Sequence, residues 1–303
     1  MCTHRSEWRA LVTEASKNRF AVATYIFTQF EPQHAQLVSE LGFPGVEPYR
    51  DNVMHYLDRL GELESLMTEH SLTVITCSNG GAGQAMDFIS KEGRSQTIDD
   101  HVAFARDFLS LFGCQHFKIN MGSRPPGGPS DDDLKALADS LNELGRHTSE
   151  LGIKLAPHPH IWGPVERPEE IDRIMELTDP SYVWMLPDTA HITLGGGDPV
   201  QIIDRYYDRI AGIHWKDCDT MYRGFTGPTP TREMHNEKIL YKDLGSGGVD
   251  LKAIWDMLQE RGSDHWITVD LDPPRASEGE GSIEEKLRIN RDYLTQTLGV
   301  PHL

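Results

Sequence analysis

The chain has 303 residues, of which 38% are hydrophobic and 25% are charged, a composition typical of a globular protein and not of a disordered or fibrous one. Its 47 acidic against 29 basic side chains give a formal net charge of -18, which repels phosphate backbones and anionic membranes and argues against both as partners. The four cysteines lie far apart without a C-x-x-C pair, which favours reduced thiols in a cytosolic protein over a disulfide or zinc framework. No run approaches the ~18 apolar residues of a spanning helix and residues 1–9 lack a signal-peptide core, so we expect a cytoplasmic protein.

Eight short apolar or β-branched runs recur along the chain, and each is followed by residues with helical spacing. We expect strands over residues 20–27, 42–47, 72–77, 116–120, 153–156, 182–186, 210–215 and 266–271. We expect helices over residues 7–16, 37–41, 55–70, 97–112, 130–151, 168–177, 199–207, 251–261 and 283–298. Thr97 with Asp100 and Ser282 with Glu285 have the spacing of capping pairs, and Asp198 is placed to cap the helix that follows it.

This alternation predicts the fold class. Eight strand–helix units, in a chain slightly longer than the ~250 residues typical of the fold, specify a (β/α)8 TIM barrel. No change of composition marks a domain boundary, so we expect a single TIM-barrel domain over residues 1–303. A doubly wound open sheet is the alternative α/β architecture, although eight units would be many for it.

Polar side chains stand where several predicted strands end. They are Glu47 after the second strand, His158 and His160 after the fifth, Asp188 and His191 after the sixth, His214 and Lys216 at the seventh, and Asp270 and Asp272 at the eighth. In a TIM barrel the carboxyl ends of the strands meet at one face, where active sites lie. Imidazoles and carboxylates from separate strands are the ligand set of a divalent metal, so we expect a metal site on this face.

Each of these residues also has a purely structural explanation. A histidine at a strand end is often only hydrogen-bonded, Asp272 before two prolines can shape a turn, and Lys216 can pair with a neighbouring carboxylate. The glycine run at residues 195–197 has no G-x-G-x-x-G pattern, which argues against a phosphate cradle. The convergence of separate strand ends on one face favours the metal site over these explanations taken singly.

In this region the chain resembles the xylose isomerase-like TIM barrels, a superfamily that includes sugar epimerases, inosose dehydratases and endonuclease IV. The motifs are P-D-T-A-H at residues 187–191, G-I-H-W-K-D at residues 212–217, and L-G-S-G-G-V-D at residues 244–250, which is similar to the family's G-x-G-x-x-D segment. The resemblance implies a divalent ion on strands five to eight, with manganese as the first choice and cobalt, iron, magnesium or zinc as alternatives. Its implied ligands are His158, Asp188, His214 and Asp270.

Two departures from the family pattern bear on the chemistry. Epimerases of the superfamily end strand five in Glu, where this chain has His158 and His160, and strand eight commonly carries Glu, where this chain has the shorter Asp270. Losing a carboxylate at strand five removes a base that epimerases and isomerases use. The histidine-rich end of strand five resembles the inosose dehydratase branch, as does L-D-P at residues 271–273.

The resemblance therefore implies a metal-dependent carbon–oxygen lyase that acts on a small neutral keto-polyol or keto-sugar. A base removes the proton next to the ketone, and an acid protonates the departing β-oxygen, which belongs to water or, in a keto-glycoside, to a glycosyl group. The catalytic candidates are His160, His191 and Glu47. The substrate-binding candidates are Lys216, Arg223 and Asp272.

Other functions stay open at this point. A ketose epimerase or isomerase of the same fold is the alternative enzyme, and a non-catalytic sugar-binding barrel is a third candidate. An endonuclease is disfavoured by the charge of -18, because it needs a basic groove. The connection over residues 219–243 is long for a βα loop and predicts either a lid over the site or an insertion that forms a homo-oligomer.

Overall fold

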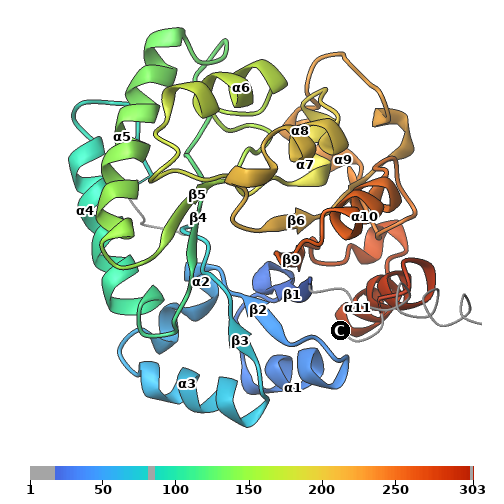
Figure 1. Cartoon of the computed structure of the whole chain (residues 1–303). Helices are drawn as coiled ribbons and strands as arrows, with labels where there is room; N and C mark the ends of the chain where they lie inside the picture. The colour runs from blue at the N-terminus through green and yellow to red at the C-terminus, as the bar shows by residue number, and fades with distance from the viewer. Residues whose placement is uncertain (1–17, 81–85, 301–302) are drawn as a thin grey trace, which may run out of the picture.

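Parallel strands form the centre of the molecule in this computed structural model, which describes residues 18–80, 86–300 and 303 (Figure 1). Five of them pair in the order β3-β2-β1-β9-β6. Their bounds are Arg19–Ala23 for β1, Gly45–Glu47 for β2, Thr73–Val74 for β3, Ile213–Trp215 for β6 and Trp266–Val269 for β9. A second parallel pair joins β4, His116–Ile119, to β5, Lys154–Pro157.

Isolated bridges and single hydrogen bonds close this arrangement into a barrel. Residues 183–188 lie between β5 and β6, because Leu155 bridges to Val183 and Asp188 bridges to His214. On the other side, the Lys118 amide of β4 donates to Thr76 Oγ1, just beyond β3, at 3.2 Å. All eight predicted strand regions therefore take barrel positions, and the predicted TIM-barrel fold is confirmed.

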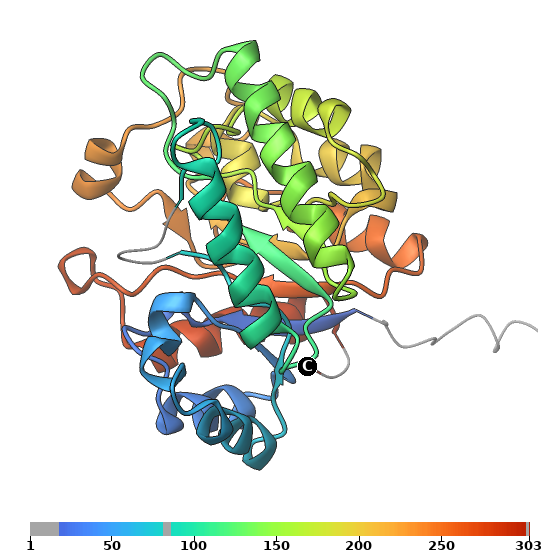
Figure 2. The same ribbon diagram turned by 90° about the vertical axis from the view of Figure 1, so that its left-hand side faces the viewer.

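Helices surround the strands in Figure 1, and α4 and α5 run side by side in Figure 2. The longer helices are α1 Pro32–Glu40, α3 Leu60–Glu69, α4 Arg94–Phe104, α5 Asp131–Ser149, α6 Pro168–Leu177, α8 Pro199–Arg205, α10 Leu251–Glu260 and α11 Ile283–Asp292. The shorter ones are α2 Arg50–Val53, α7 Thr189–Leu194 and α9 Arg232–Glu237. Within the described part of the chain, no helix has both the length and the apolar character needed to cross a membrane.

Most of the predicted helix starts agree with the structure. Ser130 and Ser282 form capping boxes, and Asp198 caps α8 through the amides of Val200 and Gln201. The predicted cap at Thr97 is wrong, because α4 begins at Arg94 and the Thr97 hydroxyl instead accepts from the amide of Asp87. The predicted helix over residues 7–16 lies outside the described residues.

The alternation of side-chain direction along β6 explains why this apolar strand places the imidazole of His214 in the barrel interior. Successive side chains of a strand point to opposite faces. Trp215 points outward, where its ring packs edge-on against Trp255 of α10 at 6.0 Å. His214 consequently points inward, and it is fully buried.

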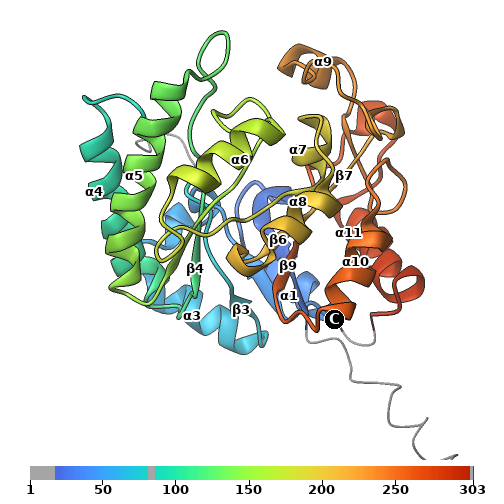
Figure 3. The same ribbon diagram turned by 45° about the horizontal axis from the view of Figure 1, so that its top comes forward.

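Residues 219–243 fold back over one end of the barrel. The short strand β7, Asp217–Cys218, pairs antiparallel with β8, Tyr241–Lys242, and α9 lies between them in sequence. Figure 3 shows α9 at the top of the molecule, beyond α7 and β7. Trp162, which follows β5, donates its indole N–H to the Pro230 carbonyl at 2.7 Å, so this connection is tied to the strand-five end of the barrel.

Candidate metal centre and active site

His214 lies at the centre of three buried carboxylates. Its Nε2 is 2.9 Å from both carboxylate oxygens of Glu47, and its Nδ1 is 3.2 Å from Asp270 Oδ2 and 3.8 Å from Asp188 Oδ2. Burial alone would lower the pKa of His214, but the charge of Glu47 and the hydrogen bonds to Glu47 and Asp270 raise it above its ordinary value. These neighbours favour the protonated imidazole over the neutral one.

Glu47 fixes the orientation of this imidazole. Thr268 Oγ1 donates to Glu47 Oε2 at 2.8 Å, and the Lys118 ammonium lies 3.7 Å from Oε1. Although burial raises the pKa of Glu47, the neighbouring His214 and Lys118 charges lower it overall, so the side chain stays ionised. A Nε2–H that donates to Glu47 leaves the Nδ1 of His214 to face Asp188 and Asp270, the pattern in which a carboxylate orients a metal-binding histidine.

Asp188 and Asp270 each present a buried oxygen without a hydrogen-bond partner. These atoms are Asp188 Oδ2 and Asp270 Oδ1, whereas Asp188 Oδ1 caps α7 by accepting from the amide of His191 at 2.8 Å. Burial and the nearby charge of Asp270 raise the pKa of Asp188 to about 6. Lys216 and His214 hold the pKa of Asp270 well below its usual range despite its burial. Asp270 Oδ1 lies 3.5 Å from the Lys216 ammonium and Asp188 Oδ2 lies 3.8 Å from His214 Nδ1, so both oxygens have a cationic neighbour but accept no hydrogen bond.

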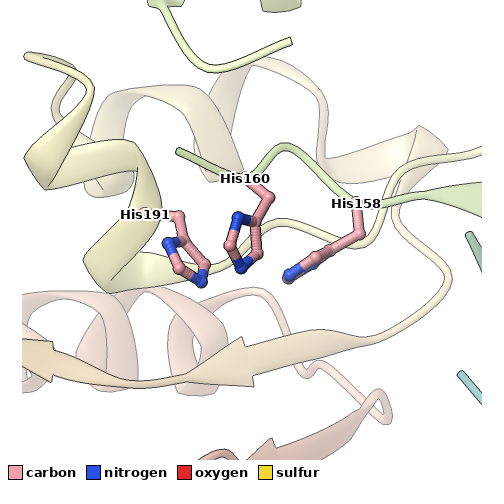
Figure 4. A group of neighbouring side chains, drawn as sticks. All are labelled: His158, His160 and His191. Carbon is pink, nitrogen blue, oxygen red and sulfur yellow. The ribbon is translucent and has the colours of Figure 1, made fainter. Parts of the chain in front are cut away.

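Three neutral imidazoles extend this cluster. Figure 4 shows His158 and His160, from the segment after β5, and His191, from α7, pointing to the same side. The His160 and His191 ring centroids are 3.6 Å apart, and the His158 ring is 4.8 Å from that of His214. Burial lowers the pKa of His160 to about 4 and those of His158 and His191 well below their ordinary value. All three are uncharged at neutral pH.

These residues fit a divalent cation. Ligand atoms of His158, Asp188 and His214 lie within 4.8 Å of one another, as do those of His158, His160 and His191. His158 Nδ1 donates to the Leu186 carbonyl at 3.1 Å, which leaves its Nε2 lone pair available. Asp270 is shorter than Glu, yet its Oδ2 reaches to 3.2 Å from His214 Nδ1, so it can complete a mixed nitrogen and oxygen donor set.

A cavity of about 260 Å³ opens beside this cluster, and we call it the catalytic cavity. His160, His191 and Asp270 form one part of its wall. Lys216 and Asp272 form another, where the ammonium donates to Asp272 Oδ1 at 2.8 Å. The structure thus brings these predicted residues together, and Asp272 pairs with Lys216.

Two predicted residues lie elsewhere. Glu47 is fully buried with both oxygens hydrogen-bonded, and it does not line the cavity. Arg223 donates to the Gly248 carbonyl at 2.9 Å and lines a separate cavity with Asp198 and Asp250. Arg232, from the same long connection, lines the catalytic cavity instead.

Sequence reasoning missed several residues of this site. Lys118 is fully buried in β4 and donates to the hydroxyl of Tyr49, a cavity residue, at 2.9 Å. A lysine between Phe117 and Ile119 in an apolar strand was a usable signal, because a charge at that position must find partners inside the barrel. Trp162 and Arg232 stand on connections whose packing no periodic pattern predicts.

Comparison with known proteins agrees with this fold. Residues 35–293 match the model of the family described as xylose isomerase-like TIM barrel. The chain belongs to this family. The resemblance seen in the motifs is thereby confirmed at the level of the family and the fold.

Curated relatives of this family member include several that are named inosose dehydratase. That of Lacticaseibacillus casei is 34% identical over 183 residues, which cover 57% of this chain and 57% of the relative. That of Clostridium botulinum, strain Alaska E43, is 27% identical over 236 residues, covering 70% of this chain and 74% of the relative. The chain therefore spans little more than half of the length of the Lacticaseibacillus casei relative.

Solved structures of low sequence identity share the fold. D-psicose 3-epimerase from Clostridium cellulolyticum H10 superposes with a TM-score of 0.74 at 12% identity, covering 94% of this chain and 100% of that one. An IOLI protein with a bound zinc atom superposes with a TM-score of 0.73 at 17% identity, covering 93% of this chain and 98% of that one. The probable 3-DHS dehydratase AsbF from Bacillus anthracis superposes with a TM-score of 0.70 at 15% identity, covering 91% of this chain and 98% of that one. Barrels of this kind therefore belong to both lyases and epimerases.

Proposed function

We propose that the chain is a metal-dependent carbon–oxygen lyase that eliminates a β-oxygen next to a ketone on a neutral polyol or sugar ring. The observation that carries this proposal is the neutral imidazole cluster at the end of β5, where a carboxylate base would serve an epimerase. The names of the curated relatives support the dehydratase direction. An inosose, a ketone of a cyclic polyol, is the simplest substrate of this class.

The proposed metal ligands are His158, Asp188, His214 and Asp270. The two aspartate oxygens that accept no hydrogen bond and the Nε2 lone pair of His158 support this set. A divalent ion bound there, manganese in the first place, would supply Lewis acidity toward the ketone oxygen. Glu47 acts through His214, because the charge of the carboxylate holds the Nε2–H of the imidazole and so aims Nδ1 at the other ligands.

His160 is the proposed base. Its Nδ1–H donates to the Ile161 carbonyl at 2.5 Å, so in the neutral ring the lone pair is on Nε2. That atom accepts the proton from the carbon next to the ketone, and the resulting imidazolium then gives the proton to the departing oxygen. Burial lowers the pKa of His160 to about 4, so the ring is neutral at neutral pH and its Nε2 lone pair is free to accept a proton.

The remaining cavity residues orient the substrate. The Tyr241 hydroxyl lies 3.4 Å from His191 Nδ1, which leaves the Nε2–H of His191 to donate to a substrate hydroxyl. The Lys216 ammonium is fixed between Asp272 and the face of the Tyr241 ring, 4.3 Å from the ring centroid. In place of Arg223, we propose Arg232 as the arginine that meets the substrate, because it lines the catalytic cavity.

The test is an elimination assay on protein whose metal content has been measured. Purified protein is reconstituted with Mn²⁺ and incubated with a keto-inositol in deuterated water, while enone absorbance and α-carbon deuteration are followed. We expect enone formation, with His160→Gln slowed by about 100-fold or more at unchanged metal content, the usual contribution of a general base. Deuteration without enone would instead assign an epimerase, and full activity of His160→Gln would remove that residue from the mechanism.

A further inference from the structure

A fully buried lysine of the barrel, Lys118, has no part in the mechanism described so far. It lies in β4 next to Phe117, whose ring packs against Phe104 of α4 with centroids 5.9 Å apart, so the lysine side chain points to the barrel interior. Among the residues that the structure describes, its ammonium has two polar partners, the Tyr49 hydroxyl at 2.9 Å and Glu47 Oε1 at 3.7 Å. Burial lowers the pKa of Lys118, while the charge of Glu47 favours the protonated form.

The contact with Lys118 decides where the Tyr49 hydroxyl points its proton. An ammonium only donates hydrogen bonds, so the Tyr49 oxygen accepts at the 2.9 Å contact and its own O–H points elsewhere. No group in residues 18–80, 86–300 and 303 accepts a hydrogen bond from this O–H, and Tyr49 lines the catalytic cavity. Burial, together with the charges of Asp270 and Glu47, raises the pKa of Tyr49 well above its ordinary value, so the hydroxyl keeps its proton. A molecule in the cavity is therefore an acceptor within reach of this donor.

Contacts on several sides hold Tyr49 in place. Its amide donates to Thr24 Oγ1 at 3.2 Å, and its backbone bridges to Ser78. The Lys118 ammonium lies 4.6 Å from the centroid of its ring, and the ring of Tyr25 packs beside it with centroids 5.2 Å apart. A donor that is fixed in advance stabilises developing negative charge without reorganising during the reaction.

Tyr49 stands across the barrel from the imidazoles of the site. It follows β2, whereas His160 follows β5 and His191 follows the sixth barrel position. The second and sixth positions of an eight-stranded barrel face each other. Because Tyr49, His160 and His191 all line the catalytic cavity, a substrate there meets the imidazoles on one side and the Tyr49 hydroxyl on the other.

We propose that Tyr49 donates a hydrogen bond to the ketone oxygen of the substrate, and that Lys118 is a positioning residue that acts through Tyr49. This proposal rests on the proposed lyase function. In the step, His160 Nε2 takes the proton from the carbon next to the ketone, and the electron pair of that C–H bond moves toward the ketone to give an enolate. The Tyr49 O–H stabilises the enolate oxygen, and no bond to Tyr49 forms or breaks. The enolate then expels the β-oxygen, which takes the proton from His160.

The experiment compares Tyr49→Phe with the wild type on Mn²⁺-loaded protein and a keto-inositol in deuterated water. We expect kcat to fall about 100-fold or more while KM changes by less than about threefold, the usual pattern for losing one donor to an oxyanion. Deuteration of the α-carbon should slow by the same factor, because exchange and elimination share the enolate. Tyr206→Phe is the matched control, since it removes a hydroxyl that donates to Asp172 away from the catalytic cavity. It should behave as the wild type.

A double variant tests the part of Lys118. Lys118→Met alone should lower kcat, whereas the same change in the Tyr49→Phe background should lower it by less than about threefold at saturating Mn²⁺, because the two residues act as one unit. Independent, additive losses would show that Lys118 acts through Glu47 and would remove it from the proposal. Tyr49→Phe carries the test of the donor if Lys118→Met does not fold.

Failure of the donor differs from failure of the lyase proposal. If Tyr49→Phe slows elimination but not deuteration, the hydroxyl serves the departing oxygen and its assignment to the ketone is overturned. If no elimination occurs in the wild type, infrared difference spectroscopy follows the C=O stretch of keto-inositol bound to metal-free protein. A stretch that moves toward the value of the free ketone in Tyr49→Phe, and not in Tyr206→Phe, supports the donor. An unchanged stretch, or no binding of keto-inositol, rejects it.

Discussion

At the scale of single residues, Glu47 decides which nitrogen of His214 is available. Both carboxylate oxygens lie 2.9 Å from Nε2, and Thr268 supplies a further hydrogen bond. Glu47→Gln keeps the shape and removes the charge, so the preference for the required orientation of the imidazole weakens. We expect metal affinity to fall about 10- to 100-fold while the protein still folds, the usual effect of losing a carboxylate behind a ligating histidine.

Competition with a calibrated chelator measures this change. Thr268→Val is the matched control, because it removes one hydrogen bond to Glu47 without changing the charge, and a smaller loss is expected. Excess Mn²⁺ should restore most of the activity of Glu47→Gln. If Glu47→Gln bound metal with wild-type affinity but lost turnover, Glu47 would not act by orienting His214. That result would instead indicate direct contact between Glu47 and the substrate.

The residues that sequence could predict are those fixed by strand geometry. Asp188, His214 and Asp270 stand at carboxyl ends of neighbouring barrel positions, and an inward side chain there can only meet the others. Lys118 is another inward-pointing residue of a barrel strand. It was predictable too, because a lysine within an apolar strand indicates a buried charge. Arg223 and Arg232 differ because they stand on a long connection, where packing and not periodicity decides which guanidinium reaches the cavity.

At the scale of elements, no sequence pattern predicts the helix α7, and the reason is physical. It begins directly after the sixth barrel position and has only 6 residues, too few to show a helical period. Its N-cap is Asp188, so the turn that forms α7 also presents the second oxygen of Asp188 to His214. Strand positions were predictable from alternation, whereas a helix that starts at a candidate metal ligand was not.

The connection over residues 219–243, which we propose acts as a lid, is fastened by Arg275. One guanidinium nitrogen donates to the His235 carbonyl and another to His235 Nε2, both at 2.8 Å. Arg275→Ala removes both bonds and frees α9 to open. Hydrogen bonds from a charged group contribute about 1.5–3 kcal/mol, so we expect amides of α9 to exchange at least about tenfold faster.

Hydrogen exchange followed by mass spectrometry checks this local effect. Amides of α10 should exchange as in the wild type. Arg261→Ala, which removes an exposed ion pair to Asp204 on the outer surface, is the control and should leave α9 unchanged. Exchange that rises equally in α9 and α10 would show general destabilisation and contradict a separately fastened lid.

At the scale of the whole molecule, buried neutral histidines away from the candidate ligands couple stability to pH. Burial lowers the pKa of His116 to about 4 and lowers that of His101. His101 is locked as a neutral tautomer, since its Nδ1 donates to the Thr97 carbonyl at 2.6 Å and its Nε2 accepts from Asn79 Nδ2 at 2.8 Å. Among the described residues, the His101 Nε2 atom faces the Asn79 amide donor, and His116 Nε2 is buried without a hydrogen-bond partner.

The sign of the pH effect follows from these directions. Above a pH of about 6.5 both histidines are neutral whether the chain is folded or unfolded, and their contribution to stability is complete. As the pH falls from 6.5 toward the folded value of about 4 for His116, the unfolded chain binds a proton that the folded protein excludes. We therefore expect His116 to lower the free energy of unfolding by about 1.4 kcal/mol per pH unit in that window, and His101 to act in the same direction. Urea unfolding of metal-free protein between pH 7 and pH 4.5 measures how the free energy of unfolding changes with pH. His116→Gln should reduce this slope by about 1.4 kcal/mol per pH unit, the equivalent of one proton. An unchanged slope in that variant would mean that His116 takes up its proton in the folded barrel.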